Sequence, residues 1–183
     1  MQCYTAGMSR KSKITLAVSL LAMTAMLVAQ SGGIKWTPPK RWTVDAPRPM
    51  RLATYKVPAA AGDSEGAECV VNYFGSGQGG SVDANITRWT GQFQTPGGQA
   101  VTGKTEKQTS NGIKVTTLDI SGTYIASGGP MMQSGPPKPN SRMLAAIVEG
   151  KQGMVFFKFA GPKKTVTAGE AEFKAMLSSI KPE

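Results

Sequence analysis

Two stretches in the first half of the chain have the residue pattern of β-strands. Residues 50–57 alternate between two faces, and residues 68–74 are rich in β-branched and aromatic side chains. The first pattern is typical of a half-buried strand and the second of a well-buried one. Between them, residues 59–66 are small or acidic and predict a loop.

Apolar side chains then recur at helical spacing. Ser81 is a favourable N-cap, and four apolar residues follow at steps of four, three and four: Val82, Ile86, Trp89 and Phe93. A polar stripe beside them consists of Asn85, Arg88 and Gln92. We expect a helix that ends near Pro96. A second helix is predicted over residues 168–180, with an inner face of Phe173, Met176, Leu177 and Ile180.

The region between the two helices predicts mainly strands. Asn111-Gly112 is a strong hairpin signal, with strands expected over 101–107 and 113–124. Residues 142–148 and 154–159 predict a further hairpin, and Gly161-Pro162 ends its second strand. Ala126 to Ser141 is rich in Gly and Pro and predicts an irregular, mobile loop.

This order of elements predicts an α+β domain. We expect a mainly antiparallel twisted sheet with one helix after the second strand and one C-terminal helix packing on it. Residues 50–183 form the predicted domain, and residues 31–49 form an extended lead-in rich in Trp and Pro.

The first 30 residues have the three parts of a secretory signal peptide. Arg10, Lys11 and Lys13 precede an uncharged apolar run from Ile14 to Ala29, and small residues follow for cleavage. The run of sixteen residues is shorter than a membrane span of ~20. We therefore expect an exported protein, periplasmic or secreted. The alternative is a protein tethered to the membrane through an uncleaved Ile14–Ala29 helix.

Positive charge is concentrated just after this segment. The whole chain carries a net charge of +10, and six Lys or Arg residues lie between Lys35 and Lys56 with only Asp45 to oppose them. Such a segment favours anionic surfaces, although it is also typical of a solvated basic face. The candidate contact residues are Lys40, Arg41, Arg48 and Arg51. The sequence has no nucleic-acid-binding motif, so we expect no nucleic acid partner.

The residue types present exclude several chemistries. The chain has no histidine, which excludes a Ser-His-Asp triad and imidazole metal ligands. Cys69 is the one cysteine after the signal, and its apolar neighbours predict a buried, inert thiol. Asp119 is expected to be a lone carboxylate on a solvated strand face. With no nucleophile and base together, we expect no catalytic residues, no metal site, no cofactor and no enzyme activity.

A glycine cluster precedes the first predicted helix. Gly75, Gly77 and Gly80 match the spacing of a dinucleotide-binding loop, but neither a parallel strand-helix-strand unit nor a suitably spaced acidic residue accompanies them. We interpret the cluster as a turn that folds the helix back onto the sheet. A second hypothesis is a small anion site formed by Gly77, Gln78, Gly79 and Arg88.

Three blocks of sequence resemble bacterial exported proteins of unassigned function. They are Asn85–Trp89, Phe156–Pro162 and Phe173–Ile180. The order of elements is similar to the PsbP/Mog1/DcrB-like architecture, whose members include assembly factors, binding modules and envelope proteins. The resemblance covers nearly the whole chain after the signal, implies a fold, and brings no catalytic residues.

The leading functional hypothesis is a non-enzymatic envelope protein that binds a protein partner or an anionic membrane surface. Its contact regions are the basic segment from Lys35 to Lys56 and the loop from Ala126 to Ser141. The alternative is a small-ligand or anion-binding module that uses the Gly75–Arg88 region, in a pocket between that region and the sheet.

Overall fold

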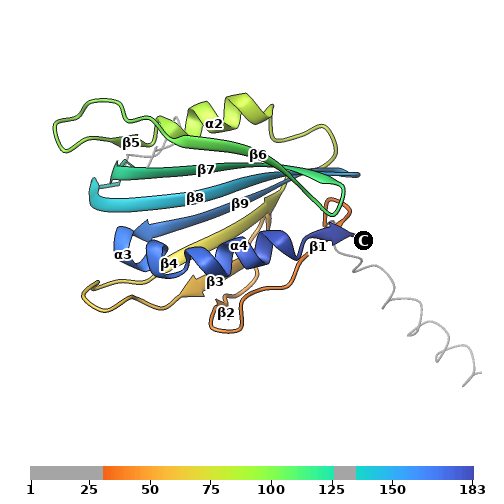
Figure 1. Ribbon diagram of the computed structural model, residues 1–183, viewed down its shortest axis with the longest axis horizontal. Helices are drawn as coiled ribbons and strands as arrows, with labels where there is room; N and C mark the ends of the chain where they lie inside the picture. The colour runs from red at the N-terminus through yellow and green to blue at the C-terminus, as the bar shows by residue number, and fades with distance from the viewer. Residues whose placement is uncertain (1–30, 126–134) are drawn as a thin grey trace, which may run out of the picture.

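Alternating strand residues build one large antiparallel sheet. The computed structural model describes residues 31–125 and 135–183. Its eight-stranded sheet has the order β2-β3-β4-β9-β8-β7-β5, with β6 also pairing with β7 (Figure 1). The strands are β2 (Thr43–Val44), β3 (Arg51–Val57), β4 (Ala67–Tyr73), β5 (Phe93–Gln94), β6 (Lys104–Ser110), β7 (Ile113–Tyr124), β8 (Lys138–Gly150) and β9 (Gly153–Pro162).

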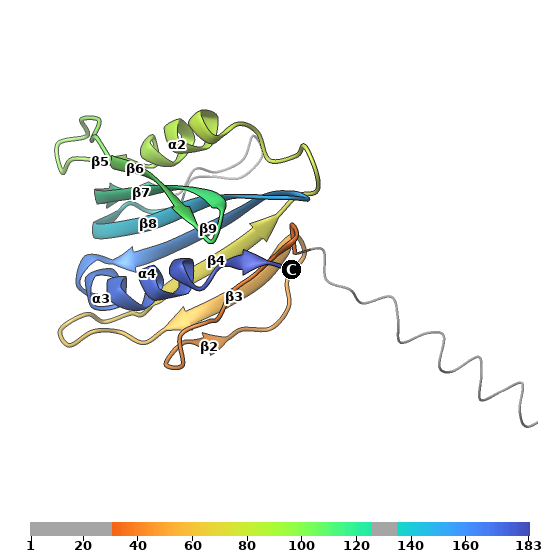
Figure 2. The same ribbon diagram turned by 45° about the vertical axis from the view of Figure 1, so that its right-hand side comes forward.

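Helices cover both faces of this sheet. Helix α2 (Val82–Thr90) lies on one face, and helices α3 (Lys163–Ala168) and α4 (Glu170–Ser178) lie on the other (Figures 1 and 2). The predicted α+β class with a mainly antiparallel sheet is therefore confirmed. In the part of the chain that is described, no helix is long and apolar enough to cross a membrane.

The sheet separates two hydrophobic cores because adjacent residues of a strand point to opposite faces. In β9, Phe157 and Phe159 belong to the core under α3 and α4, whereas Phe156 belongs to the core under α2. Trp89 of α2 is 3% exposed and packs edge-on against Phe156. The alternation of β9 therefore decides which side chains face the space beside α2.

The lead-in segment is part of the domain and contains two short strands. Strand β1 (Ile34–Lys35) pairs with β10 (Lys181–Pro182), which joins the start of the described chain to its end. Ile34 and Trp42 are buried in the α4-side core. Because β1 and β2 precede β3 and β4, the first described helix follows the fourth strand, whereas we predicted that it follows the second.

Several predicted boundaries differ from the structure. Helix α2 ends at Thr90, and Phe93 is buried on β5, where it pairs with Tyr124. The predicted strand 101–107 is shifted to Lys104–Ser110. Part of the predicted loop is strand, since β8 begins at Lys138. Residues 135–137 are described and lie outside the strand, whereas residues 126–134 of that loop and the predicted signal peptide lie outside the described residues.

The helix predicted over residues 168–180 corresponds to α4, and helix α3, which we did not predict, comes directly before it. They are separated at Gly169, where a Cβ atom would lie 2.7 Å from the ring of Phe159. The close approach of backbone to ring explains why a glycine stands between α3 and α4. The predicted inner face is confirmed, because Phe173, Met176, Leu177 and Ile180 are all buried.

Candidate functional site

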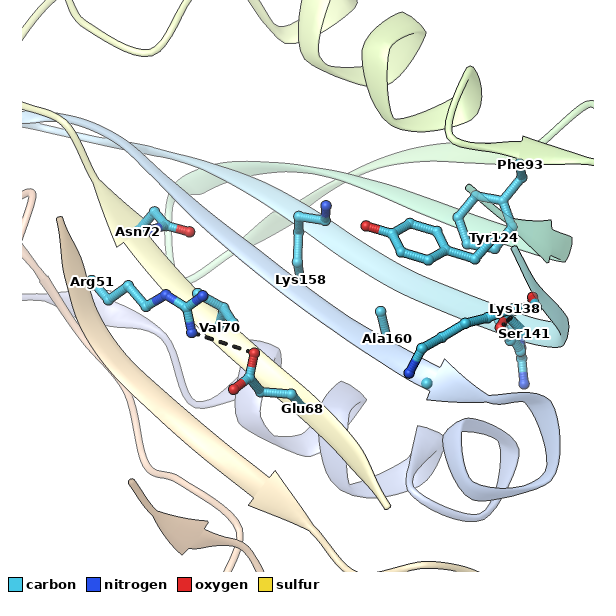
Figure 3. A pocket seen from close by; sticks show the side chains of 12 residues that line it. Arg51, Glu68, Val70, Asn72, Phe93, Tyr124, Lys138, Ser141, Lys158 and Ala160 are labelled. Carbon is cyan, nitrogen blue, oxygen red and sulfur yellow. Dashed lines mark hydrogen bonds and ion pairs between the residues drawn. The ribbon is translucent and has the colours of Figure 1, made fainter. Parts of the chain in front are cut away.

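A groove of about 430 Å³ lies on the α2 side of the sheet, where the helix leaves strands β3, β4 and part of β9 uncovered (Figure 3). Its floor consists of alternate residues of β4 and β9. The lining residues are Arg51, Glu68, Val70, Asn72, Phe93, Tyr124, Lys138, Ser141, Arg142, Lys158, Ala160 and Gly161.

Lys158 rises from the middle of this floor. It is held between two apolar core residues of β9, Phe157 and Phe159, and the strand alternation directs it away from their core. Its Nζ donates a hydrogen bond to Gln92 Oε1 at 3.1 Å and lies 5.8 Å from the centre of the Trp89 ring. The end of α2 therefore provides the contacts that fix this ammonium group.

The surroundings of Lys158 disfavour its charge. Its pKa is lowered to about 8, first because burial removes water from the ammonium group and second because Arg88 is close. Its hydrogen-bond acceptor is a neutral amide. Within the described residues, no carboxylate forms an ion pair with Lys158. The groove thus contains a positive charge that lacks a negative counterpart.

The other cations at the groove have carboxylate partners. Arg51 Nη1 lies 3.3 Å from Glu68 Oε2, and Lys138 Nζ lies 3.1 Å from Glu65 Oε1. These pairs lie toward the rim, where Glu65 and Lys138 are both more than half exposed. Lys158 therefore differs from Arg51 and Lys138 in having no carboxylate partner.

An aromatic wall closes one end of the groove. The rings of Phe93 and Tyr124 are 5.2 Å apart, and the hydroxyl end of Tyr124 points toward Lys158 (Figure 3). Burial raises the pKa of Tyr124, so its phenol stays protonated at neutral pH and can donate a hydrogen bond. The groove combines an unpaired cation with a hydroxyl donor, whereas the Asn72 amide nitrogen donates to the Met50 carbonyl oxygen at 2.8 Å.

This arrangement suits an anion more than a metal ion. An ammonium group with little water around it is stabilised by an acceptor of opposite charge, and a hydroxyl donor adds a hydrogen bond to the same oxygens. The described residues contain no cluster of three or more His, Cys, Asp or Glu side chains that could hold a metal ion. The thiol of Cys69 lies on the opposite face, fully buried, and burial raises its pKa.

The structure places one of the four predicted anion-site residues near the groove. Arg88 is exposed, donates to the side chain of Asn85 and lies close enough to lower the pKa of Lys158. Gly77, Gln78 and Gly79 are not among the groove-lining residues and lie before the start of α2.

The glycine loop has a packing role. The Asn85 side chain donates to the carbonyl oxygens of Gly79 and Ser81, at 2.7 and 2.8 Å, and so joins the loop to the helix. Gly79 has a φ of +92° and lies against the Phe156 ring. Asn85, predicted on a polar stripe, is 2% exposed because its amide makes these bonds beneath the loop.

Three of the four predicted surface-contact residues form ion pairs. Arg41 pairs with Glu172, Arg48 pairs with Asp45, and Arg51 pairs with Glu68, whereas Lys40 is exposed. Glu172 and Glu68 are far from these arginines in sequence. The charge excess of this segment is therefore smaller in the folded protein than along the chain.

Asp119 is not the lone carboxylate that we expected. It accepts two hydrogen bonds from Arg142, at 2.9 and 2.7 Å, and Arg142 also pairs with Glu170 of α4 at 2.8 Å. The register of β7 against β8 brings Asp119 beside Leu144, so Arg142 reaches it diagonally from two residues away. The prediction was wrong because strand pairing, which sets this neighbour, is not a local property.

Sequence reasoning missed Lys158 as a site residue. One signal was present, since a lysine interrupts the apolar run Phe156-Phe157-Lys158-Phe159. Strand alternation alone leaves such a lysine on a solvated face. The crossing of α2 over the sheet is what buries it.

Comparisons with known proteins give matches among solved structures alone. No family model and no curated protein sequence matches the chain. A protein of unknown function from Pseudomonas aeruginosa is similar with a TM-score of 0.48 and 11% identity, over 78% of this chain and 98% of that one. The solution structure of cyanobacterial PsbP from Synechocystis is similar with a TM-score of 0.48 and 12% identity, over 84% of this chain and 89% of that one.

Structural similarity to a PsbP-type protein is thus observed, as the sequence resemblance predicted. At 11% and 12% identity these similarities transfer no function to this chain.

Proposed function

We propose that this protein is an exported, non-enzymatic binding module that takes a small anionic molecule in the groove beside α2. The observation that carries the proposal is the ammonium group of Lys158, which is half-buried beside Trp89 and has a neutral amide as its acceptor. A desolvated charge without a counter-charge is unfavourable, and a bound anion relieves that cost.

The groove residues support a ligand with a compact oxygen-bearing group. Lys158 supplies the charge, the Tyr124 hydroxyl can donate a hydrogen bond, and Val70 and Ala160 offer apolar contact. Arg88 strengthens the positive field from α2. Glu68 is neutralised by Arg51, so it does not repel the ligand strongly.

The test is titration of the folded protein with sodium acetate and with inorganic phosphate, followed by NMR chemical shifts. We expect shifts at groove residues and weaker binding by at least about 10-fold in Lys158→Met, since a charge-assisted hydrogen bond contributes roughly 1.5–3 kcal/mol. Arg88→Ala is expected to weaken binding less. Lys151→Met removes an equal charge from an exposed turn and serves as the control.

The proposal fails if neither anion shifts groove resonances, or if Lys158→Met and Lys151→Met bind equally well. Parallel urea titrations of each variant confirm that the fold is retained. The comparison of the two lysine variants separates a specific site from a general effect of net charge.

We also propose a second candidate, docking to an anionic membrane surface through residues 40–51. Its support is the exposure of two apolar side chains beside the basic ones, Val44 at 64% and Met50 at 69%. Apolar side chains flanked by basic residues suit a phospholipid surface. The ion pairs of Arg41, Arg48 and Arg51 weaken this candidate relative to the groove.

Its test is sedimentation with phosphatidylcholine vesicles that contain or lack phosphatidylglycerol, at low and high salt. We expect binding to the anionic vesicles at low salt, reduced by Met50→Ser and by Lys40→Gln. Absence of binding to anionic vesicles at low salt removes this candidate and leaves the groove proposal unaffected.

A further inference from the structure

Lys158 has the surroundings of a reactive amine. Partial burial and a neighbouring cation, the two environments that activate lysine nucleophiles, both act on it, since Trp89 and the sheet cover part of its side chain and Arg88 is close. Its hydrogen-bond acceptor, Gln92 Oε1, is uncharged. A neutral acceptor does not hold a proton on the amine as a carboxylate does. A substantial fraction of Lys158 is therefore neutral amine near pH 8.

The other groove lysine provides a contrast within the same site. Lys138 is more than half exposed and pairs with Glu65 at 3.1 Å, so its amine has the water and the carboxylate partner that Lys158 lacks. Figure 3 shows Lys158 rising from the floor of the groove, with the Tyr124 hydroxyl pointing toward it. The nucleophile and a hydroxyl donor thus line one hollow that is open to small molecules.

We propose that Lys158 forms a reversible imine with a small carboxylate that carries an aldehyde or ketone group. This inference rests on the proposed function, because the same groove collects the anion. The Nζ lone pair forms a bond to the carbonyl carbon, and the carbonyl oxygen leaves as water with the two amine hydrogens. The Tyr124 hydroxyl is placed to donate a hydrogen bond to that departing oxygen.

The protonated imine keeps the positive charge of the site. Once the imine nitrogen takes a proton from solvent water, it carries the same single positive charge as the ammonium group that it replaces, so the carboxylate of the ligand retains its partner. Water can reverse the reaction because the groove is open to solvent, and the step requires no oxidant or reductant. The ligand class is therefore an oxo acid such as glyoxylate or pyruvate, bound by capture rather than turnover.

The test traps the imine by reduction. The folded protein is incubated with glyoxylate and sodium cyanoborohydride, which delivers hydride to the C=N bond and leaves a stable carboxymethyl amine. Peptide mapping then gives the labelling rate of every lysine. We expect Lys158 to be labelled at least about 10-fold faster than exposed lysines near neutral pH, because its lower pKa increases the neutral fraction more than it lowers nucleophilicity. In urea this preference should disappear.

Two variants separate this inference from the proposed function. Lys158→Arg keeps a positive charge but cannot form an imine, so it should bind acetate and lose the preferential adduct. Lys138→Arg is the matched control in the same groove and should keep the Lys158 adduct. Uniform labelling of lysines in a protein that still binds acetate overturns the imine and leaves the anion site standing. Failure to bind acetate, with uniform labelling, overturns both.

Discussion

Asp63 caps helix α3 from a loop one hundred residues away in the sequence. Its Oδ2 accepts hydrogen bonds from the backbone N–H of Thr165 at 2.8 Å and from the Thr165 hydroxyl at 2.7 Å. Thr165 is 1% exposed, and its hydroxyl also accepts from the Ala60 N–H at 3.0 Å. Since Pro162 at the N-cap has no side-chain cap, Asp63 supplies the missing acceptor.

Asp63→Ala should therefore lower the free energy of unfolding by about 1–2 kcal/mol, because it leaves a buried hydroxyl and a helix N–H without their acceptor. Urea denaturation followed by circular dichroism measures the change. Glu65→Gln, in the same loop but on an exposed ion pair, should change stability by less than about 0.5 kcal/mol. Equal effects of the two substitutions would show that Asp63 does not cap the helix.

Gly79 and Gly77 make a second pair of contrasting sites. Both have positive φ, but a Cβ at Gly79 would lie 2.7 Å from the Phe156 ring, whereas nothing lies within 4 Å of one at Gly77. Gly77→Ala should cost about 1 kcal/mol from backbone strain alone, and Gly79→Ala more than about 2 kcal/mol, because the ring must move. Thermal unfolding of the two variants checks the order, and a larger loss at Gly77 would contradict it.

Arg142 links two strands to the C-terminal helices. Its side chain is 11% exposed and contacts Asp119, Glu170 and Thr167. Arg142→Met should destabilise the protein by about 2–4 kcal/mol, because two carboxylates lose their shared cation and face each other. Lys174→Met removes the exposed partner of Glu170 and should cost less than about 0.5 kcal/mol. Urea titrations at two salt concentrations measure both, and similar losses would mean that Arg142 contributes only as a surface charge.

Lys158 should make stability depend on pH in the alkaline range. Its pKa is about 8 in the folded protein, below the ordinary value, so the unfolded chain binds more protons between pH 8 and about 10.5. Below pH 8 the charged Lys158 lowers the free energy of unfolding by its full amount, and this loss of stability disappears as the pH rises through this window. Lys158→Met should therefore be more stable than the wild type at pH 7, on the order of 1 kcal/mol.

The measurement is the free energy of unfolding of both proteins at pH 7 and near pH 10. The advantage of Lys158→Met should shrink at the higher pH, while tyrosine titration cancels because both proteins share it. Lys151→Met, on an exposed turn, should show no such pH-dependent difference. A constant difference between Lys158→Met and the wild type would mean that the amine is not desolvated.

Local signals in the sequence determined most of the elements. The Asn111-Gly112 turn and the β-branched run after it place β7 at residues 113–124, as predicted. The apolar spacing of the last helix correctly predicts its buried face, from Phe173 to Ile180. These features depend on turn geometry and on the repeat of strands and helices, which neighbouring residues set among themselves.

The candidate site was decided by tertiary structure. The alternation of β9 places Lys158 and Phe157 on opposite faces of the sheet. Only the crossing of α2 brings Gln92 and Trp89 to Lys158 and reduces its contact with water. In the same way, strand register brings Arg142 to Asp119, and helix packing brings Glu172 to Arg41. Burial and ion pairing depend on residues that are distant along the chain. The sequence by itself therefore determined which elements form. Tertiary packing decided which charged side chains have a partner of opposite charge, and it leaves Lys158 without one.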